Sequence, residues 1–333
     1  MPDSKKVALI GTGGTIAAVG AGPFDLIDYD DNGHMLDVGE LLAVLPALPD
    51  GVEVFTVALP PISSTGIYFE HWQKLVELCA ELEASHPDLT GIVITHGTAS
   101  MEETAYFLNL TLKTRVPVVM VGSQRPASAL SSDAPLNLYN AIRVATMNEA
   151  RGAGVLVVLN DEIHSARDVT KTSTYRLQTF RSPDFGVLGH CDADEVAFYR
   201  QPVRRHAPNT EFDLAQTRTL PSVGIAYSHT GSDGCVIRAL TAAGMPGIVL
   251  AAFAPGCYSS AEAAALHDAV AKGVVVVISS RAGSGRVGDG IEIRRAGMIA
   301  ADNLNPQKAR LLLALALTKT SDIDEIRRMF QTY

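Results

Sequence analysis

The 333-residue sequence lacks any apolar run approaching the roughly 20 residues that a membrane-spanning helix needs. Its first residues, MPDSKKVALIGTGG, reach glycines before an apolar segment long enough for a signal peptide develops. With 47% hydrophobic and 19% charged residues, the composition is typical of a soluble globular protein, and the length favours two domains. We therefore expect a cytoplasmic protein with no membrane partner.

Concentrated positive charge is also missing. The formal net charge is -9, and no cluster of lysine and arginine exceeds pairs such as Arg204 and Arg205. Because binding to phosphate backbones needs a concentrated basic face, we expect no nucleic-acid partner.

Cysteines are few and scattered. The four thiols of Cys79, Cys191, Cys235 and Cys257 form no C-x-x-C pair, which disfavours a zinc site and suits reduced thiols in a cytosol. We expect most of them to be small core residues.

Short apolar runs alternate with amphipathic stretches through the first 160 residues. Strands are predicted at 7–10, 52–59, 91–95, 116–122 and 154–160. Helices are predicted at 69–84, 101–112 and 135–150. This alternation predicts an α/β fold with a mostly parallel sheet and helices on both faces.

The alternation stops over 198–221, a polar stretch with three prolines, and a second, smaller alternation follows it. We therefore predict an N-terminal α/β catalytic domain over 1–205, a linker over 206–221 and a smaller C-terminal α/β domain over 222–333.

The first stretch that could carry chemistry is LIGTGGTIA at 9–17, where a strand runs into glycines and threonines. A dinucleotide fingerprint fails because Ile16 stands where the third glycine is needed, and the Gly-Lys-Ser/Thr of a phosphate-binding loop is absent. What remains is a tight turn at the carboxyl end of a strand, where α/β sheets place ligands. In this turn the hydroxyls of Thr12 and Thr15 either contact a ligand or cap the following helix.

A second such stretch is THGTASMEET at 95–104, again between a strand and a helix. Thr98 and Ser100 both suit a helix N-cap, and the two glutamates after them suit the first helical turn. Capping does not explain a Thr-His-Gly-Thr run at a strand end. His96 alone is more typical of a hydrogen-bonded core histidine than of a catalyst.

The third stretch is NDEIHSARDVTKTST at 160–174. Lys171 within it is either a solvated charge or, if desolvated, a base able to take the proton of a threonine hydroxyl, which is otherwise a weak nucleophile. Two threonines at strand ends and one lysine are a candidate nucleophile and base.

Four stretches together resemble signatures of the bacterial L-asparaginase and glutaminase-asparaginase family of amidohydrolases, in the family's order and spacing. They are TGGTIA at 12–17, ITHGTASMEETAYFL at 94–108, DVTKTST at 168–174 and NPQKARLLLALALT at 305–318. Weaker similarity between them extends the resemblance over nearly the whole chain. It implies a two-domain α/β fold, a homotetramer built from intimate dimers, no cofactor, and hydrolysis of a small amide through a threonine acyl-enzyme.

The resemblance also implies roles for individual residues. Thr12 would be the nucleophile, on a flexible lid that carries Tyr29, and Thr98 with Lys171 would form a second catalytic pair. Ser64 would hold the substrate carboxylate, and the backbone around Thr98 and Ala99 would supply oxyanion donors. The other substrate-binding positions are expected at Thr15, Thr65, Ala99 and Cys257.

The sequence departs from the family where an α-ammonium group would be recognised. Ala99 stands in place of an aspartate that orients the lysine and grips the ammonium. Cys257 replaces an asparagine that the C-terminal domain would contribute to a neighbouring subunit's site. A family glutamate falls near Gly290, with Asp289 or Glu292 as substitutes. Losing a carboxylate neighbour lowers a lysine's pKa, so catalysis need not be lost.

Three functions follow from this resemblance. The default is hydrolysis of L-asparagine to L-aspartate and ammonia. The same hydrolysis on an amide without the α-ammonium, such as a succinamate-like compound, is the first alternative. The second is a catalytically silent member that binds an amide or amino acid, although a binding protein needs no nucleophile and base together.

Overall fold

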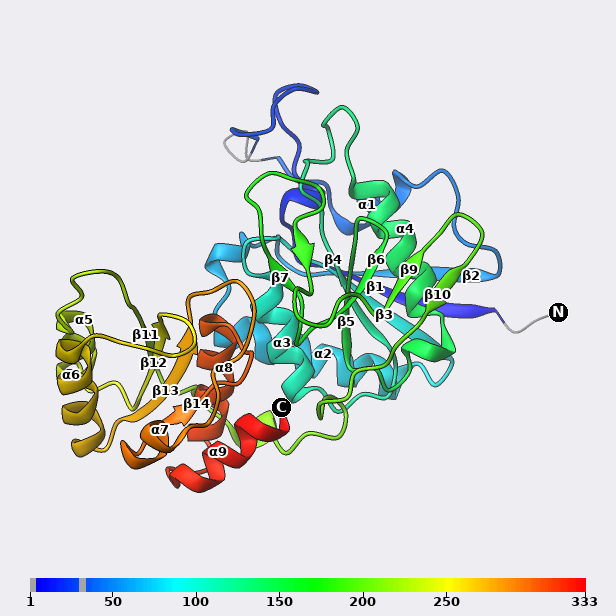
Figure 1. Cartoon of the computed structure of the whole chain (residues 1–333). Helices are drawn as coiled ribbons and strands as arrows, with labels where there is room; N and C mark the ends of the chain where they lie inside the picture. Colours follow the sequence, from blue (N-terminus) through cyan, green and yellow to red (C-terminus); the bar gives the residue numbers. More distant parts are fainter. Residues whose placement is uncertain (1–3, 30–33) are drawn as a thin grey trace. The chain divides into compact units, whose positions relative to one another are not determined.

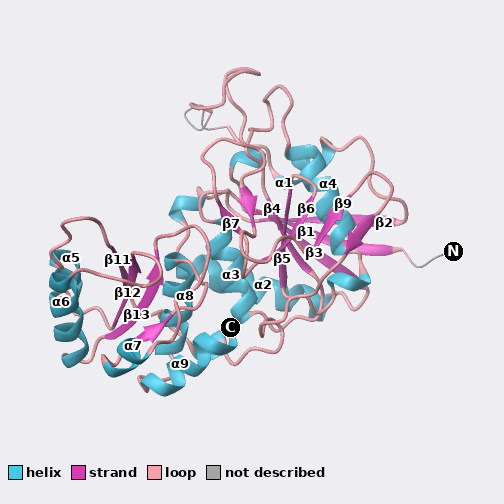
Figure 2. Ribbon diagram, viewed as in Figure 1, coloured by secondary structure: helices cyan, strands magenta, loops and turns pink. Residues whose placement is uncertain are grey.

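The computed structural model describes residues 4–29 and 34–333. The chain divides into two compact units, Met1–Thr210 and Glu211–Tyr333. Each unit contains its own sheet and helices (Figures 1 and 2).

The first unit is built on an eight-stranded sheet with the order β10-β9-β6-β5-β4-β3-β1-β2. Its strands are β1 (Lys5–Gly11), β2 (Val52–Ala58), β3 (Leu89–Thr95), β4 (Val118–Val121), β5 (Val155–Leu159), β6 (Glu162–Ser165), β9 (Gly189–Cys191) and β10 (Val196–Phe198). The first five run parallel, whereas β6, β9 and β10 pair antiparallel. A separate hairpin pairs β7 (Thr170–Lys171) with β8 (Phe180–Arg181).

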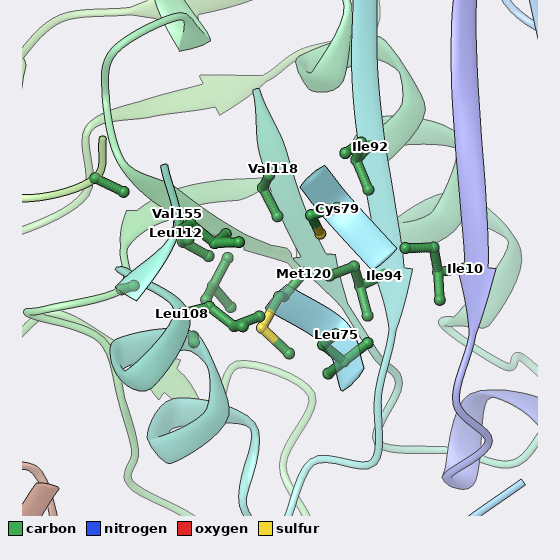
Figure 3. Packing of buried hydrophobic residues seen from close by; sticks show 14 of the residues in the cluster. Ile10, Leu75, Cys79, Ile92, Ile94, Leu108, Leu112, Val118, Met120 and Val155 are labelled. Atoms are coloured by element: carbon green, nitrogen blue, oxygen red, sulfur yellow. The ribbon is translucent and has the colours of Figure 1, made fainter. Parts of the chain in front are cut away.

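Helices cover both faces of the parallel strands. They are α1 (Val38–Ala43), α2 (Phe69–Ser85), α3 (Met101–Thr111) and α4 (Ala134–Ala145). Alternate strand residues face opposite sides, so neighbours in one strand enter different cores. Ile92 and Ile94 of β3 pack with α2 and α3, and Val93 between them packs with α1 and α4. Figure 3 shows the first of these cores, with Met120 of β4 beside Ile94.

The second unit has a four-stranded parallel sheet, β11-β12-β13-β14. Its strands are β11 (Val223–Tyr227), β12 (Gly247–Ala252), β13 (Val275–Ser280) and β14 (Ile299–Ala300), and its helices are α5 (Cys235–Ala242), α6 (Ser260–Ala271), α7 (Ile291–Arg295), α8 (Pro306–Leu317) and α9 (Ile323–Thr332). Helix α8 packs against the three longer strands. Pro306 at its first turn is a favourable start because proline lacks only an N–H that would be unpaired there.

The predicted parallel strands and their helices are confirmed, with boundaries shifted by at most five residues. The antiparallel strands β6, β9 and β10 were not predicted, since each has only three or four residues. The cysteine prediction is wrong for two thiols: Cys79 and Cys191 are buried, but Cys235 and Cys257 are exposed. Within the described residues, no helix combines the length and apolar character needed to cross a bilayer.

Candidate active site

The site begins at the carboxyl ends of β1 and β3, which pair in parallel with Gly11 opposite Thr95. In the sheet, β1 lies between β3 and β2. The chain therefore leaves β1 toward one neighbour and returns on its other side, which reverses the strand order at β1. Open α/β sheets bind ligands in the crevice at such a reversal of strand order. Thr12 follows β1 directly and is 6% exposed, and its Oγ1 donates to the Thr95 carbonyl at 2.7 Å.

Two glycines allow the turns after β1 and β3 to touch. Gly14 has a φ of +89°, and a Cβ built on it would lie 2.4 Å from the backbone N and Cα of Gly97. A Cβ on Gly97 would lie 2.7 Å from Oγ of Ser64, which is buried in the turn after β2. The Ser64 carbonyl also accepts a 2.6 Å hydrogen bond from Ser100. The three turns that carry Thr12, Ser64 and Thr98 therefore pack into one cluster.

Replacing Gly14 by alanine tests this close approach. The new methyl group would clash with backbone and occupy a positive φ, so we expect the free energy of unfolding to fall by at least about 2 kcal/mol. Gly22→Ala is the matched control, because nothing lies within 4 Å of a Cβ there. Equal urea midpoints for the two variants would contradict the packing described.

Lys171 joins this cluster through Thr98. The β7–β8 hairpin places Nζ of Lys171 2.8 Å from Oγ1 of Thr98, a hydroxyl on a residue only 6% exposed. Burial lowers the pKa of Lys171 below its ordinary value, and the charge of Glu102 raises it in part. Desolvation therefore favours the neutral amine, the form that can accept a proton.

Glu102 is a residue whose role sequence reasoning missed. It was assigned only to the first turn of α3, where it does lie, but its side chain is buried. Its Oε1 accepts a 3.3 Å hydrogen bond from the backbone N–H of Lys171. The one hint in the sequence was that Glu102 follows Thr98 by four residues. An acidic residue in the first turn of a helix explains that position equally well.

His96 is a core histidine, as its isolation in the sequence suggested. Its ring is 1% exposed, Nδ1 lies 2.8 Å from the Gly97 carbonyl, and burial lowers its pKa to about 4. The neutral ring donates from Nδ1 and fixes the peptide that precedes Thr98. Nε2 has no hydrogen-bond partner among the described residues.

The buried His96 makes stability depend on pH. Its ordinary pKa is 6.5, so the unfolded chain takes up this proton before the folded one does. The free energy of unfolding should therefore fall as the pH drops from 6.5 to 4, by up to about 3 kcal/mol. His96→Asn keeps a donor and removes the titration. Urea melts across this range should differ in pH slope between the two proteins, and identical slopes would contradict the assignment.

Three further residues of the first unit that were expected at the site are Thr15, Tyr29 and Thr65. Thr15 is half-buried, and its Oγ1 lies 3.1 Å from the hydroxyl of Tyr29. Tyr29 therefore bonds to Thr15 and, among the described residues, not to Thr12. Thr65 is exposed, with its hydroxyl 2.9 Å from that of Ser63.

Ala99 is exposed in the turn between Thr98 and α3. The position therefore has room for a larger side chain, but alanine supplies no carboxylate there. Cys257 is exposed in the second unit, in the turn after β12. Also in that unit, Asp289 accepts a 3.1 Å hydrogen bond from Arg294 and is thus already paired. Glu292 is exposed on α7.

The site therefore contains the buried hydroxyl of Thr12, the hydroxyl of Thr98 in contact with the Lys171 amine, and the backbone of the turns that carry the two threonines. No hydrogen bond to a described residue engages the N–H groups of Thr98 and Ala99. In the part of the chain that the structure describes, no group of three or more His, Cys, Asp or Glu side chains could hold a metal ion. Hydroxyl, amine and free N–H groups together are the components of nucleophilic acyl transfer.

Comparison with known proteins agrees with this chemistry. The family model "Asparaginase, N-terminal" matches residues 6–204, and "Glutaminase/Asparaginase C-terminal domain" matches residues 222–330. L-asparaginase 2 of Bacillus subtilis is 41% identical over 99% of this chain and 87% of its own length. The glutaminase-asparaginase of Pseudomonas fluorescens is 40% identical over 98% of this chain and 90% of its own length.

A solved structure extends the match to the fold. The probable cytoplasmic L-asparaginase of Campylobacter jejuni superposes with a TM-score of 0.90 at 40% identity, covering 99% of this chain and all of that one. Similarity of this extent, over both units, confirms the two-domain fold and the resemblance read from the sequence. The chain therefore belongs to the asparaginase family and is an amidohydrolase of the asparaginase type.

Proposed function

We propose that this protein hydrolyses the terminal amide of a four-carbon dicarboxylic acid monoamide, with L-asparagine as the default substrate. The observation that carries the proposal is the 2.8 Å contact between Lys171 Nζ and Thr98 Oγ1, in the same cluster of turns as the Thr12 hydroxyl. The names of the relatives, L-asparaginase and glutaminase-asparaginase, support the amide and the default substrate.

The reaction proceeds in two halves. Thr12 Oγ1 attacks the amide carbon, and its proton reaches the leaving nitrogen, so the C–N bond breaks and ammonia departs. A water molecule then attacks the resulting ester, which releases the carboxylic acid and restores the threonine hydroxyl. A neutral Lys171, acting through Thr98, supplies the base that either half requires.

The remaining groups position the substrate and its developing charge. The N–H groups of Thr98 and Ala99 are free to donate to an oxyanion. We assign the substrate carboxylate to Ser64, and its burial beside Gly97 in the same cluster of turns supports this role. Tyr29 and Thr15 act as a pair at the entrance rather than on the nucleophile itself. Thr65 is the adjacent exposed hydroxyl that extends the substrate-binding wall.

Ammonia release by Lys171 variants tests the assignment of the base. Lys171→Met should lower kcat/KM about 100-fold, as the loss of a general base does. Lys171→Arg keeps the charge and a donor for Thr98 but cannot accept a proton at ordinary pH, so it should fail equally. Full activity in Lys171→Arg would show that a base is not needed at this position.

A second candidate substrate is a monoamide without the α-ammonium, such as succinamate. Ala99 and Cys257, which stand where the resemblance implies polar residues of the ammonium site, favour it. Asp289 already pairs through Oδ2 with Arg294. A cationic amine placed against these side chains loses its hydration without gaining a carboxylate. The penalty of several kcal/mol is enough to change the preferred substrate.

We also propose a homotetramer of intimate dimers, in which 222–333 completes the site of a neighbouring subunit after a linker over 206–221. The two family models, which leave 205–221 unmatched, support this division. A solution mass four times that of the chain would agree with it, and a monomer that hydrolyses the amide at full rate would contradict it. A cytoplasmic location is proposed as well, on the similarity to the Campylobacter jejuni protein.

A further inference from the structure

The first unit contains a cavity of about 270 Å³ that includes none of Thr12, Thr98 and Lys171. Its walls come from the segment between β6 and β7 and from 185–188 and 200–206. Sites for small molecules usually measure roughly 300–1,000 Å³, so this cavity suits a ligand at the small end of that range.

Arginines dominate its charged lining. Arg167, Arg200, Arg204 and Arg205 all line the cavity, whereas Asp168 is the one acidic residue that lines it in the described part of the chain. Arg167 is only 6% exposed and lies 3.2 Å from Asp168, while Arg205 is exposed. A buried guanidinium beside Asp168 and an exposed arginine therefore lie at two depths of the cavity. A ligand with an anionic group at each end matches this arrangement.

The lining of the cavity is also partly apolar. Arg200 donates from Nη1 to the Phe185 carbonyl and from Nη2 to the Val187 carbonyl, so it holds the segment 185–187 in place. Phe185 and Leu188 contribute carbon surface to the cavity. Apolar side chains together with arginines suit a short hydrocarbon chain with charged ends better than they suit an inorganic ion.

From this lining we propose that the cavity is a second, non-catalytic binding site for a small dicarboxylate. One carboxylate pairs with the buried Arg167 and the other with Arg204 and Arg205, and the carbon chain lies against the apolar wall. Planar carboxylates and guanidinium groups form bidentate pairs, which makes arginine the suitable partner. Arg167 and Asp168 lead directly into β7, so the bound ligand would contact the segment that carries Lys171.

Val203 offers a clean test because it borders the cavity and is 97% exposed, so no packing is lost on substitution. Val203→Glu adds a negative charge, and Val203→Gln is the uncharged control of the same size. Because succinate is also the product of succinamate hydrolysis, it can bind at the Thr12 site as well. Isothermal titration with succinate should therefore show an additional binding event that weakens about ten-fold in Val203→Glu, while binding at the Thr12 site is unchanged. The Val203→Gln variant should bind as the wild type does.

An additional binding event that is unchanged in Val203→Glu would overturn the proposal, and so would the absence of this event from the wild type. Titration with inorganic phosphate tests the ligand class. Phosphate that binds as tightly as succinate, with the same sensitivity to Val203→Glu, would overturn the dicarboxylate assignment because charge alone would then suffice. The readout is binding, so its failure is distinct from any failure of the amidase reaction.

Discussion

Thr12→Val should lower kcat/KM for ammonia release by on the order of 10⁴, the scale on which loss of a catalytic nucleophile acts. Valine has the shape of threonine, so the packing of the turn after β1 is kept. The variant loses the hydrogen bond from Oγ1 to the Thr95 carbonyl, which costs about 1 kcal/mol of stability. The fold therefore survives while the group that forms the ester is removed.

Thr12→Ser is the matched control, because it restores a hydroxyl at the same position. We expect Thr12→Ser to recover a substantial part of the activity and Thr12→Val to bind substrate without turning it over. A Thr12→Val enzyme that works within ten-fold of the wild type would remove Thr12 from the role of nucleophile and leave Thr98 as the attacking group.

Ala99→Asp should change which substrate is preferred. The exposed turn at Ala99 can accept a carboxylate, which would pair with an α-ammonium group. We expect the ratio of kcat/KM for L-asparagine to that for succinamate to rise by about 10³, corresponding to about 4 kcal/mol of added ammonium recognition. Ala99→Asn has the same size without the charge and should leave the ratio nearly unchanged. An equal rise in both variants would mean that charge is not the cause.

The same substitution makes a prediction about pH. Burial already lowers the pKa of Lys171, and a carboxylate next to Thr98 would raise that pKa again. Because the neutral amine is the active form, activity increases as the pH rises through this pKa. The rising limb of the kcat/KM profile should therefore move to higher pH in Ala99→Asp, and a shift to lower pH would contradict the role of Lys171.

The main elements of the fold follow from sequence periodicity. Each parallel strand is a short continuous run of β-branched and aliphatic residues, such as the stretch around Ile92, because both faces of such a sheet are buried. The strands β6 and β9 could not be predicted in the same way. They are too short to show a period, and their antiparallel pairing depends on contacts with β5 and β10 that the local sequence does not encode.

The site was predictable where strand ends meet and less so elsewhere. Parallel strands bring their carboxyl ends to one edge, so hydroxyls after β1 and β3 were expected to be neighbours. The contact between Lys171 and Thr98 rests on a two-residue strand. The residues alone made Lys171 a candidate base for a strand-end threonine, and the family resemblance named Thr98 as its partner. The partnership of Glu102 with the Lys171 backbone is long-range, and a first-turn acid predicts only helix capping.

Ammonia release by the wild-type protein from L-asparagine and from succinamate, measured side by side, tests the central claim most directly. We expect one ammonia per molecule of acid formed from L-asparagine, the default substrate. The second candidate, which rests on Ala99, predicts a kcat/KM for succinamate at least equal to that for L-asparagine. A strong preference for L-asparagine would overturn the argument from Ala99. No ammonia from either monoamide would contradict the proposed hydrolysis itself.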